Sequence, residues 1–121
     1  MDVNVLVLAY LGDSVYEVLV REYLISLGTF KVDELDKRAI TFVSAKGQVS
    51  KLNYLLDNGL LTDDEIDIVK RGRNYKKSSH PKHTDVITYK LSTGFEAMIG
   101  WLYLNDKKIR IQEIFDLIKE I

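Results

Sequence analysis

The sequence predicts a single all-α domain, because its apolar residues recur at helical spacing and no stretch sustains the alternation of a strand. Proline, which interrupts helices, occurs once, at Pro81. Of the 121 residues, 46% are hydrophobic and 29% are charged. This composition is typical of a globular protein, and the length suits one hydrophobic core. We therefore expect one domain over residues 1–121.

Three helices are expected in the first half of the chain. Apolar residues at intervals of three and four predict the first from Val3 to Leu27, with Gly28 as its C-terminal cap. The same spacing predicts a second helix over residues 32–43. Ser44 is expected to cap a third helix that ends near Gly59, because serine side chains accept hydrogen bonds from the first amides of a helix.

The second half predicts three more helices separated by one long loop. Thr62, with Glu65 three residues later, forms the capping-box pattern of a fourth helix, which Gly72 is expected to end. Residues 73–83 read as a loop. The last two helices are expected from Thr84 or Ser92 to about Leu104, and from Lys107 or Lys108 to Ile121.

Several classes of protein are excluded or disfavoured by composition. The chain has no cysteine, which excludes disulfides, zinc-thiolate sites and cysteine nucleophiles. We expect no signal segment, because a basic and then apolar stretch is not found at the start of this sequence, and no apolar run approaches the roughly 20 residues of a membrane helix. A reducing cytosol suits such a chain, so we expect a cytoplasmic protein.

Positive charge is concentrated in one segment. Six of the seventeen Lys and Arg residues, both histidines and no acid lie between Lys70 and His83, so the net charge of −1 leaves −7 on the rest of the chain. Such a segment is either an ordinary solvated charge run or a surface that neutralises nucleic-acid phosphates. We favour nucleic acid, and the residues expected to contact it are Lys70, Arg71, Arg73, Asn74, Lys76, Lys77, Lys82 and His83.

Two isolated acids provide the strongest chemical signal. Asp13 is the only charged residue in positions 3–16, and Glu96 is the only one in positions 91–105. An ionised carboxylate among apolar side chains needs a proton, a basic partner or a cation. If their helices pack together, Asp13 and Glu96 can share a divalent ion. Carboxylate oxygens without histidine or cysteine suit Mg²⁺ or Mn²⁺ rather than zinc.

Simpler interpretations of these acids stay open at this point. Asp13 can cap a helix that starts at the next residue. Glu96 can complete a capping box with Thr93. Glu17 lies on the same helical face as Asp13, where it either reaches the ion through water or pairs with Arg21, four residues further on.

Both acids lie in stretches that resemble a known family. Residues 8–17, which contain Leu11-Gly12-Asp13, resemble the Leu-Gly-Asp signature of the ribonuclease III catalytic domain, and Phe95-Glu96-Ala97-Met98-Ile99-Gly100 resembles its second signature. The fuller resemblance, over nearly the whole chain, is to Mini-ribonuclease III, the subfamily without a double-stranded-RNA-binding domain. Its further stretches are Val43-Ser44-Ala45-Lys46, Arg71-Gly72-Arg73-Asn74 and Pro81-Lys82-His83-Thr84-Asp85, which leads into Thr88-Tyr89.

The resemblance carries over only two metal ligands. Full-length ribonucleases III have additional acids where this chain has Leu6, Ala9 and Thr93. Asp13 and Glu96 are therefore the residues that the resemblance implies as catalytic and metal-binding. Asp85 matches the subfamily pattern, and it is expected to orient the loop, to cap a helix or to approach the ion. Asp85 and Glu17 are both candidates to act on the ion only through another group.

The resemblance also implies an activity and partners. It implies a ribonuclease III-like helical bundle that forms a homodimer and hydrolyses double-stranded RNA with Mg²⁺, or Mn²⁺ as a substitute, leaving 5′-phosphate and 3′-hydroxyl ends. The implied substrate is the 23S (large-subunit) precursor ribosomal RNA of the assembling ribosome. A two-fold dimer, with residues 3–20 as a candidate contact, offers two equivalent sites to two antiparallel strands. The rival interpretations are a non-catalytic module that binds double-stranded RNA and a protein-interaction domain.

Overall fold

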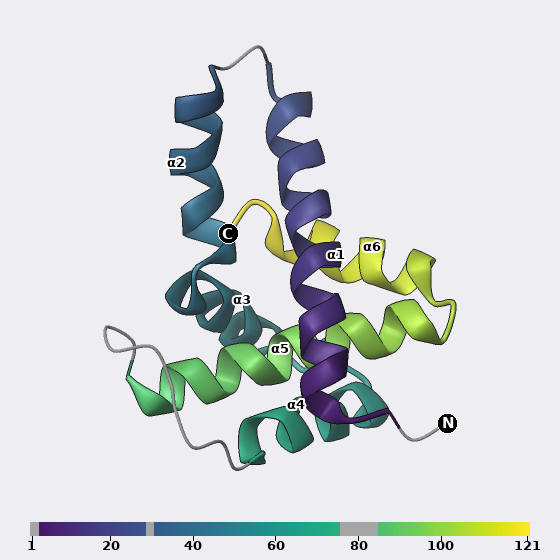
Figure 1. The fold of residues 1–121 in the computed structure, drawn as a ribbon. Helices are drawn as coiled ribbons and strands as arrows, with labels where there is room; N and C mark the ends of the chain where they lie inside the picture. The colour runs from purple at the N-terminus through teal and green to yellow at the C-terminus, as the bar shows by residue number, and fades with distance from the viewer. Residues whose placement is uncertain (1–2, 29–30, 76–84) are drawn as a thin grey trace.

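Six α-helices make up the computed structural model, which describes residues 3–28, 31–75 and 85–121 (Figure 1). Within those ranges there is no β-strand, and the predicted all-α class is confirmed. None of these helices is both long and apolar enough to cross a membrane. The helices are α1 (Val5–Ser26), α2 (Val32–Val43), α3 (Ala45–Asp57), α4 (Asp63–Asn74), α5 (Val86–Leu104) and α6 (Lys108–Ile118).

Local capping signals place several helix ends where the sequence predicted them. Ser44 ends α2 and also begins α3, because its hydroxyl accepts a hydrogen bond from the Gly47 amide at 3.0 Å. The capping box before α4 is present as well: the Thr62 amide donates to Glu65 Oε1 at 2.8 Å, and the Glu65 amide donates to Thr62 Oγ1 at 3.2 Å.

Other predicted boundaries were wrong. Gly72 does not end α4, which continues to Asn74, because this glycine is packed inside the protein rather than placed in a turn. The cap of α5 is Asp85, not Thr84 or Ser92, since its carboxylate accepts a hydrogen bond from the Thr88 amide at 3.0 Å. Residues 76–84, most of the predicted loop, lie outside the described ranges.

The apolar helix α5 is the centre of the fold. It contacts α1, α4, α3 and α6, and Figure 1 shows it crossing behind α1 with α4 below it. Nine of its residues are buried, which explains why its sequence is almost uniformly apolar. From α6, the four side chains predicted to face inward are buried: Ile111, Ile114, Phe115 and Ile118.

A buried ion pair joins α4 to α6. Glu65 is only 2% exposed, and Arg110 donates to its two carboxylate oxygens at 2.8 and 2.9 Å and to the Leu60 carbonyl at 2.8 Å. Burial raises the pKa of Glu65, but the hydrogen bonds from Arg110 and Thr62 outweigh it and leave the pKa below its usual value. The pair fixes the start of α4, while the other end of this helix packs against α5.

Candidate active site

The site is built where α1 crosses α5. A Cβ atom on Gly12 would overlap the carbonyl group of Glu96 and lie 2.8 Å from the Gly100 amide nitrogen. A Cβ atom on Gly100 would likewise overlap the Leu8 carbonyl. Only glycine allows this approach, because the two backbones are in direct contact. The crossing therefore brings Asp13, the neighbour of Gly12, to the helix that carries Glu96.

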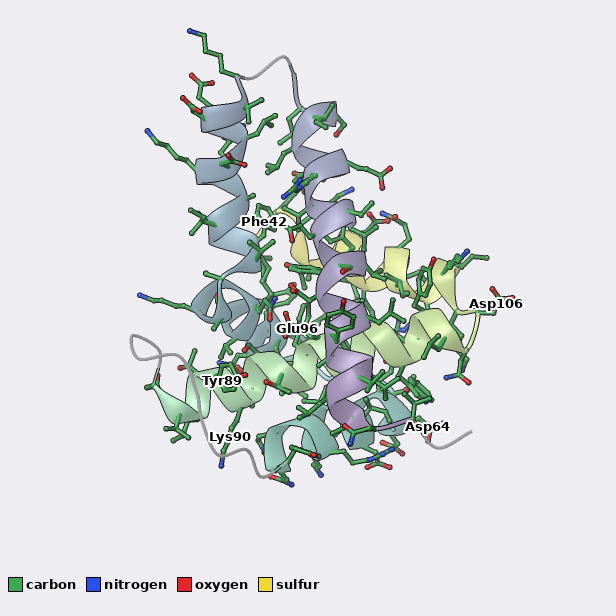
Figure 2. All side chains as sticks on the ribbon, viewed as in Figure 1. Phe42, Asp64, Tyr89, Lys90, Glu96 and Asp106 are labelled. Carbon is green, nitrogen blue, oxygen red and sulfur yellow. The ribbon has the colours of Figure 1, made fainter. Side chains whose placement is uncertain are left out.

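Asp13 and Glu96 both lie inside their helices, so neither is a cap. The cap of α1 is Asn4, whose side chain accepts a hydrogen bond from the Leu6 amide at 2.7 Å. Asp13 is exposed on the middle of α1, and Glu96 is half-buried in the middle of α5. Figure 2 shows the Glu96 side chain on the side of α5 that faces α1 and α3. The capping interpretations of both acids are wrong.

A glutamine that the sequence did not single out contacts Glu96. Gln48, on α3, is 1% exposed, and its Nε2 donates to Glu96 Oε2 at 3.2 Å and to the Val43 carbonyl at 3.3 Å. Its carbonyl oxygen Oε1 is buried and has no hydrogen-bond partner among the described residues. The sequence did contain a signal that Gln48 is buried, because its spacing places it on the same helical stripe as Leu52 and Leu55.

Aromatic side chains of α1 and α5, the two helices that carry the acids, pack against each other. Tyr16, one turn after Asp13, meets Phe95 edge-on with ring centroids 5.0 Å apart, and it meets Phe115 at 6.1 Å. Tyr16 is 1% exposed, and burial raises the pKa of its hydroxyl, so that the group stays neutral. Its hydroxyl oxygen is also buried and has no hydrogen-bond partner within residues 3–28, 31–75 and 85–121.

The donor set fits Mg²⁺ better than a metal that needs a protein cage. Among residues 3–28, 31–75 and 85–121, no three acids or histidines are close enough to hold a metal ion together. Mg²⁺ is commonly held by one or two carboxylates and keeps several of its waters. Asp13 and Glu96 are two carboxylates of the kind that such an arrangement uses. The buried Oε1 of Gln48 needs a donor, and waters around a cation are donors.

The two acids expected to act through other groups have partners of their own. Glu17 Oε1 accepts a hydrogen bond from Arg21 at 2.8 Å, forming the exposed i,i+4 ion pair that was one of its two interpretations. The Asp85 carboxylate accepts hydrogen bonds from the Thr88 amide and hydroxyl, which lower the pKa of Asp85. In this structure Asp85 caps α5.

The basic segment begins at the end of α4. Four of its expected RNA-binding residues are described, and all four are exposed: Lys70, Arg71, Arg73 and Asn74. A surface hollow of about 710 Å³ is lined by Lys70, Arg71 and Asn74, together with Asn4 at the start of α1. The other four, Lys76, Lys77, Lys82 and His83, lie outside the described residues.

Comparison with known proteins decides the family. Residues 6–107 match the family model of the ribonuclease III domain, a span that contains both Asp13 and Glu96. The chain belongs to the ribonuclease III family. As a member of this family, it is an endoribonuclease, and the family's substrate is double-stranded RNA.

Relatives within the ribonuclease III family cover most of the chain. It is 48% identical over 111 residues to the Mini-ribonuclease 3 of Brevibacillus brevis, an alignment that covers 92% of this chain and 81% of that protein. It is 43% identical over 113 residues to the Mini-ribonuclease 3 of Enterococcus faecalis, covering 93% and 86%. The crystal structure of a Fusobacterium nucleatum protein superposes with a TM-score of 0.86 at 31% identity, covering 98% and 93%. The resemblance inferred from the two signatures is confirmed.

Proposed function

We propose that this chain is a Mg²⁺-dependent endoribonuclease that cleaves double-stranded RNA with Asp13 and Glu96 as its metal-binding, catalytic carboxylates. The observation that supports this most directly is the backbone contact between Gly12 and Glu96, which joins the two acid-bearing helices at that point. Mn²⁺ is expected to substitute for Mg²⁺, because both accept carboxylate oxygens.

The reaction is hydrolysis of a phosphodiester bond. When bound, Mg²⁺ lowers the pKa of a coordinated water and polarises the phosphate, the two effects by which divalent ions promote such hydrolysis. Asp13, exposed on α1, and Glu96, half-buried on α5, are the residues that would hold the ion. Water oxygen bonds to phosphorus while the bond to the 3′ oxygen breaks. That oxygen takes up a proton, which leaves 3′-hydroxyl and 5′-phosphate ends.

The exposed cations at the end of α4 are proposed to bind the RNA backbone. Gly72 packs against Gly94, since a Cβ on Gly72 would lie 2.6 Å from the Gly94 Cα. Gly94 and Glu96 are two residues apart, about 3 Å along the axis of α5. The α4 crossing and the carboxylates therefore lie at nearly the same level along α5, and Lys70 and Arg71 are proposed to contact phosphates of the RNA there, with the expected contacts Lys76, Lys77, Lys82 and His83 in the same segment of the sequence.

We propose a homodimer formed through α1. Four large apolar side chains on one stripe of this helix are exposed, namely Val7 at 53%, Tyr10 at 81%, Val18 at 55% and Ile25 at 60%, and the first three lie within residues 3–20. Beside the stripe lies a groove of about 490 Å³, mostly apolar, whose lining includes Leu11 and Ile111. Exposed apolar patches of this kind are typical of protein interfaces. A two-fold pair would present one carboxylate site to each strand of a duplex.

The biological substrate proposed is the precursor of large-subunit (23S) ribosomal RNA, cleaved in the cytoplasm. The support is the resemblance of residues 43–46 and 71–74 to Mini-ribonuclease III and the 38–48% identity to several proteins of that name. In this proposal one domain, residues 1–121, carries both the RNA contacts and the chemistry.

Cleavage of a long RNA duplex, with and without Mg²⁺, tests the function. The native protein should cut it, and Asp13→Asn should bind it without cutting. Asp106→Asn is the matched control, because it removes one exposed carboxylate at the far end of α5 (Figure 2). Equal inactivity of the native and Asp13→Asn proteins, with binding retained, would indicate an RNA-binding module. No affinity for duplex at low salt would indicate a protein-interaction domain.

The proposed substrate has a test of its own. A duplex with the paired ends of the ribosomal precursor, cut faster than an unrelated one, would support it.

A further inference from the structure

A single buried amide connects three helices at the carboxylate site. Gln48 belongs to α3, its Nε2 donates to Glu96 of α5 at 3.2 Å, and the same nitrogen donates to the carbonyl of Val43 at 3.3 Å. Val43 is the last residue of α2, where helix carbonyls lack partners within the helix. One side chain therefore satisfies the end of α2 and contacts a proposed metal ligand.

The orientation of this amide is set by the chemistry of its neighbours. Both partners of Nε2 are oxygen acceptors, a carboxylate and a backbone carbonyl. Exchanging Nε2 and Oε1 would place an acceptor against two acceptors. The –NH₂ group must therefore face Glu96. Gln48 as a whole is only 1% exposed to solvent.

The backbone that carries Gln48 is also held firmly. Its amide donates to the Ser44 carbonyl at 2.9 Å in the first turn of α3. A Cβ atom on Gly47 would overlap the Thr41 carbonyl, so the corner between α2 and α3 is packed backbone against backbone. The Ser44 hydroxyl caps that turn through the Gly47 amide at 3.0 Å. This corner contains the stretch Val43-Ser44-Ala45-Lys46, to which neither metal binding nor RNA binding assigns a role.

We infer that Gln48 is a positioning residue that orients the Glu96 carboxylate for the divalent ion, an inference that rests on the proposed function. Glutamate has three rotatable side-chain bonds, so its carboxylate needs an outside contact to stay in one place. The amide supplies one such contact, to Oε2, from a rigid corner. Groups that hydrogen-bond to metal ligands in this way orient them, and their loss commonly weakens metal affinity by about 10- to 100-fold.

Metal binding by the RNA-free protein tests the inference directly. Gln48→Met keeps the length of the side chain and removes the donor, so Mn²⁺ affinity, measured by electron paramagnetic resonance, should fall by about 10-fold or more. Duplex cleavage should then need a higher Mg²⁺ concentration and recover much of its rate when Mg²⁺ is raised. Unchanged Mn²⁺ affinity in a folded Gln48→Met protein would overturn the inference, even if the cleavage rate fell.

Two further variants test whether a loss of Mn²⁺ affinity comes from the missing hydrogen bond or from a general change in the structure. Gln112→Met makes the same chemical change on the exposed face of α6 and should leave Mn²⁺ affinity unchanged. Gln48→Asn keeps an amide but shortens its reach by one methylene. It should also weaken Mn²⁺ binding, and it decides the question if Gln48→Met does not fold. Native-like affinity in Gln48→Asn would then overturn the inference.

The outcomes for the native protein separate this inference from the proposed function. If the native protein binds no Mn²⁺ and cuts no duplex with Mg²⁺, the proposed function fails and the role of Gln48 fails with it. If the native protein binds and cuts while the Gln48 variants show the same metal dependence, only the positioning role is overturned.

Discussion

Helix α5 crosses two other helices through glycine, and the two crossings carry opposite charges. At the crossing with α1, a Cβ on Gly12 would overlap the Glu96 carbonyl. At the crossing with α4, a Cβ on Gly72 would lie 2.6 Å from the Gly94 Cα. The α1 crossing is therefore the closer of the two. In both cases the absence of a side chain lets two backbones touch.

The chemistry around each crossing is different. Carboxylates, Asp13 and Glu96, lie at the α1 crossing, whereas exposed cations, among them Arg71 and Arg73, lie at the α4 crossing. The comparison shows that one packing arrangement can position either kind of charge. In the proposed enzyme, the carboxylates at the α1 crossing take part in cleaving the RNA, and the cations at the α4 crossing bind it.

The largest effect is expected from adding a methyl group at the closer crossing. Gly12→Ala should lower the free energy of unfolding by about 3 kcal/mol, because the backbone atoms in its way cannot move aside as a flexible side chain can. Gly72→Ala should cost less, about 1–2 kcal/mol. Urea unfolding of both variants provides the measurement.

A third glycine, Gly59, tests the cost of backbone strain alone, without overlap between an added Cβ and its neighbours. Gly59 has a φ of +63° and nothing within 4 Å of an added Cβ, so Gly59→Ala should cost only the roughly 1 kcal/mol of a left-handed alanine. Equal losses for Gly12→Ala and Gly72→Ala would show that the two crossings are equally close.

A smaller effect is expected from removing charge at the α4 crossing. Arg71→Ala combined with Arg73→Ala should weaken duplex binding about tenfold at low salt and reduce its salt dependence, because each lost phosphate contact lowers the slope by about one. The matched control is Lys31→Ala with Lys37→Ala, two exposed cations on α2 and just before it. Filter binding across salt concentrations measures the effect. A slower cleavage rate at saturating RNA would contradict the claim that these two arginines bind RNA without taking part in its cleavage.

The smallest effect concerns the ion pair that fixes the other end of α4. Hydrogen bonds hold the pKa of Glu65 below its usual value in the folded protein, so the unfolded chain takes up a proton first as the pH falls. The stabilisation is full above the usual glutamate pKa and is lost as the pH falls through the lower, folded-state value. Glu65→Gln should therefore cost about 1 kcal/mol at neutral pH and progressively less in acid. Thermal unfolding of both proteins from neutral to acidic pH gives the comparison, and a constant difference would refute it.

Local signals in the sequence predicted much of the fold. The bounds of α2, the Ser44 cap and the Thr62 capping box depend on residues a few positions apart, and all three were confirmed. Asp13 and Glu96 stood out because long apolar stretches surround them. That their helices would touch needed the two glycines, whose role is visible only once the helices are packed.

The errors and omissions share one cause, which is contact between distant parts of the chain. Gly72 reads as a helix end in the sequence, yet it is helical because Gly94 packs against it. Gln48 looks like an ordinary polar residue until Glu96, 48 positions away, accepts its hydrogen bond. Arg110 meets Glu65 across 45 positions in the same way.

The direct contact of α1 with α5 has a consequence for how such a protein can change over time. Where side chains separate two helices, each exchange of a leucine for a valine alters the gap between them. Here main-chain atoms meet main-chain atoms, and their size is the same whatever residues occupy the surrounding core. The rest of the interior is therefore free to diverge while the distance between the two acid-bearing backbones stays the same, provided that both glycines are retained.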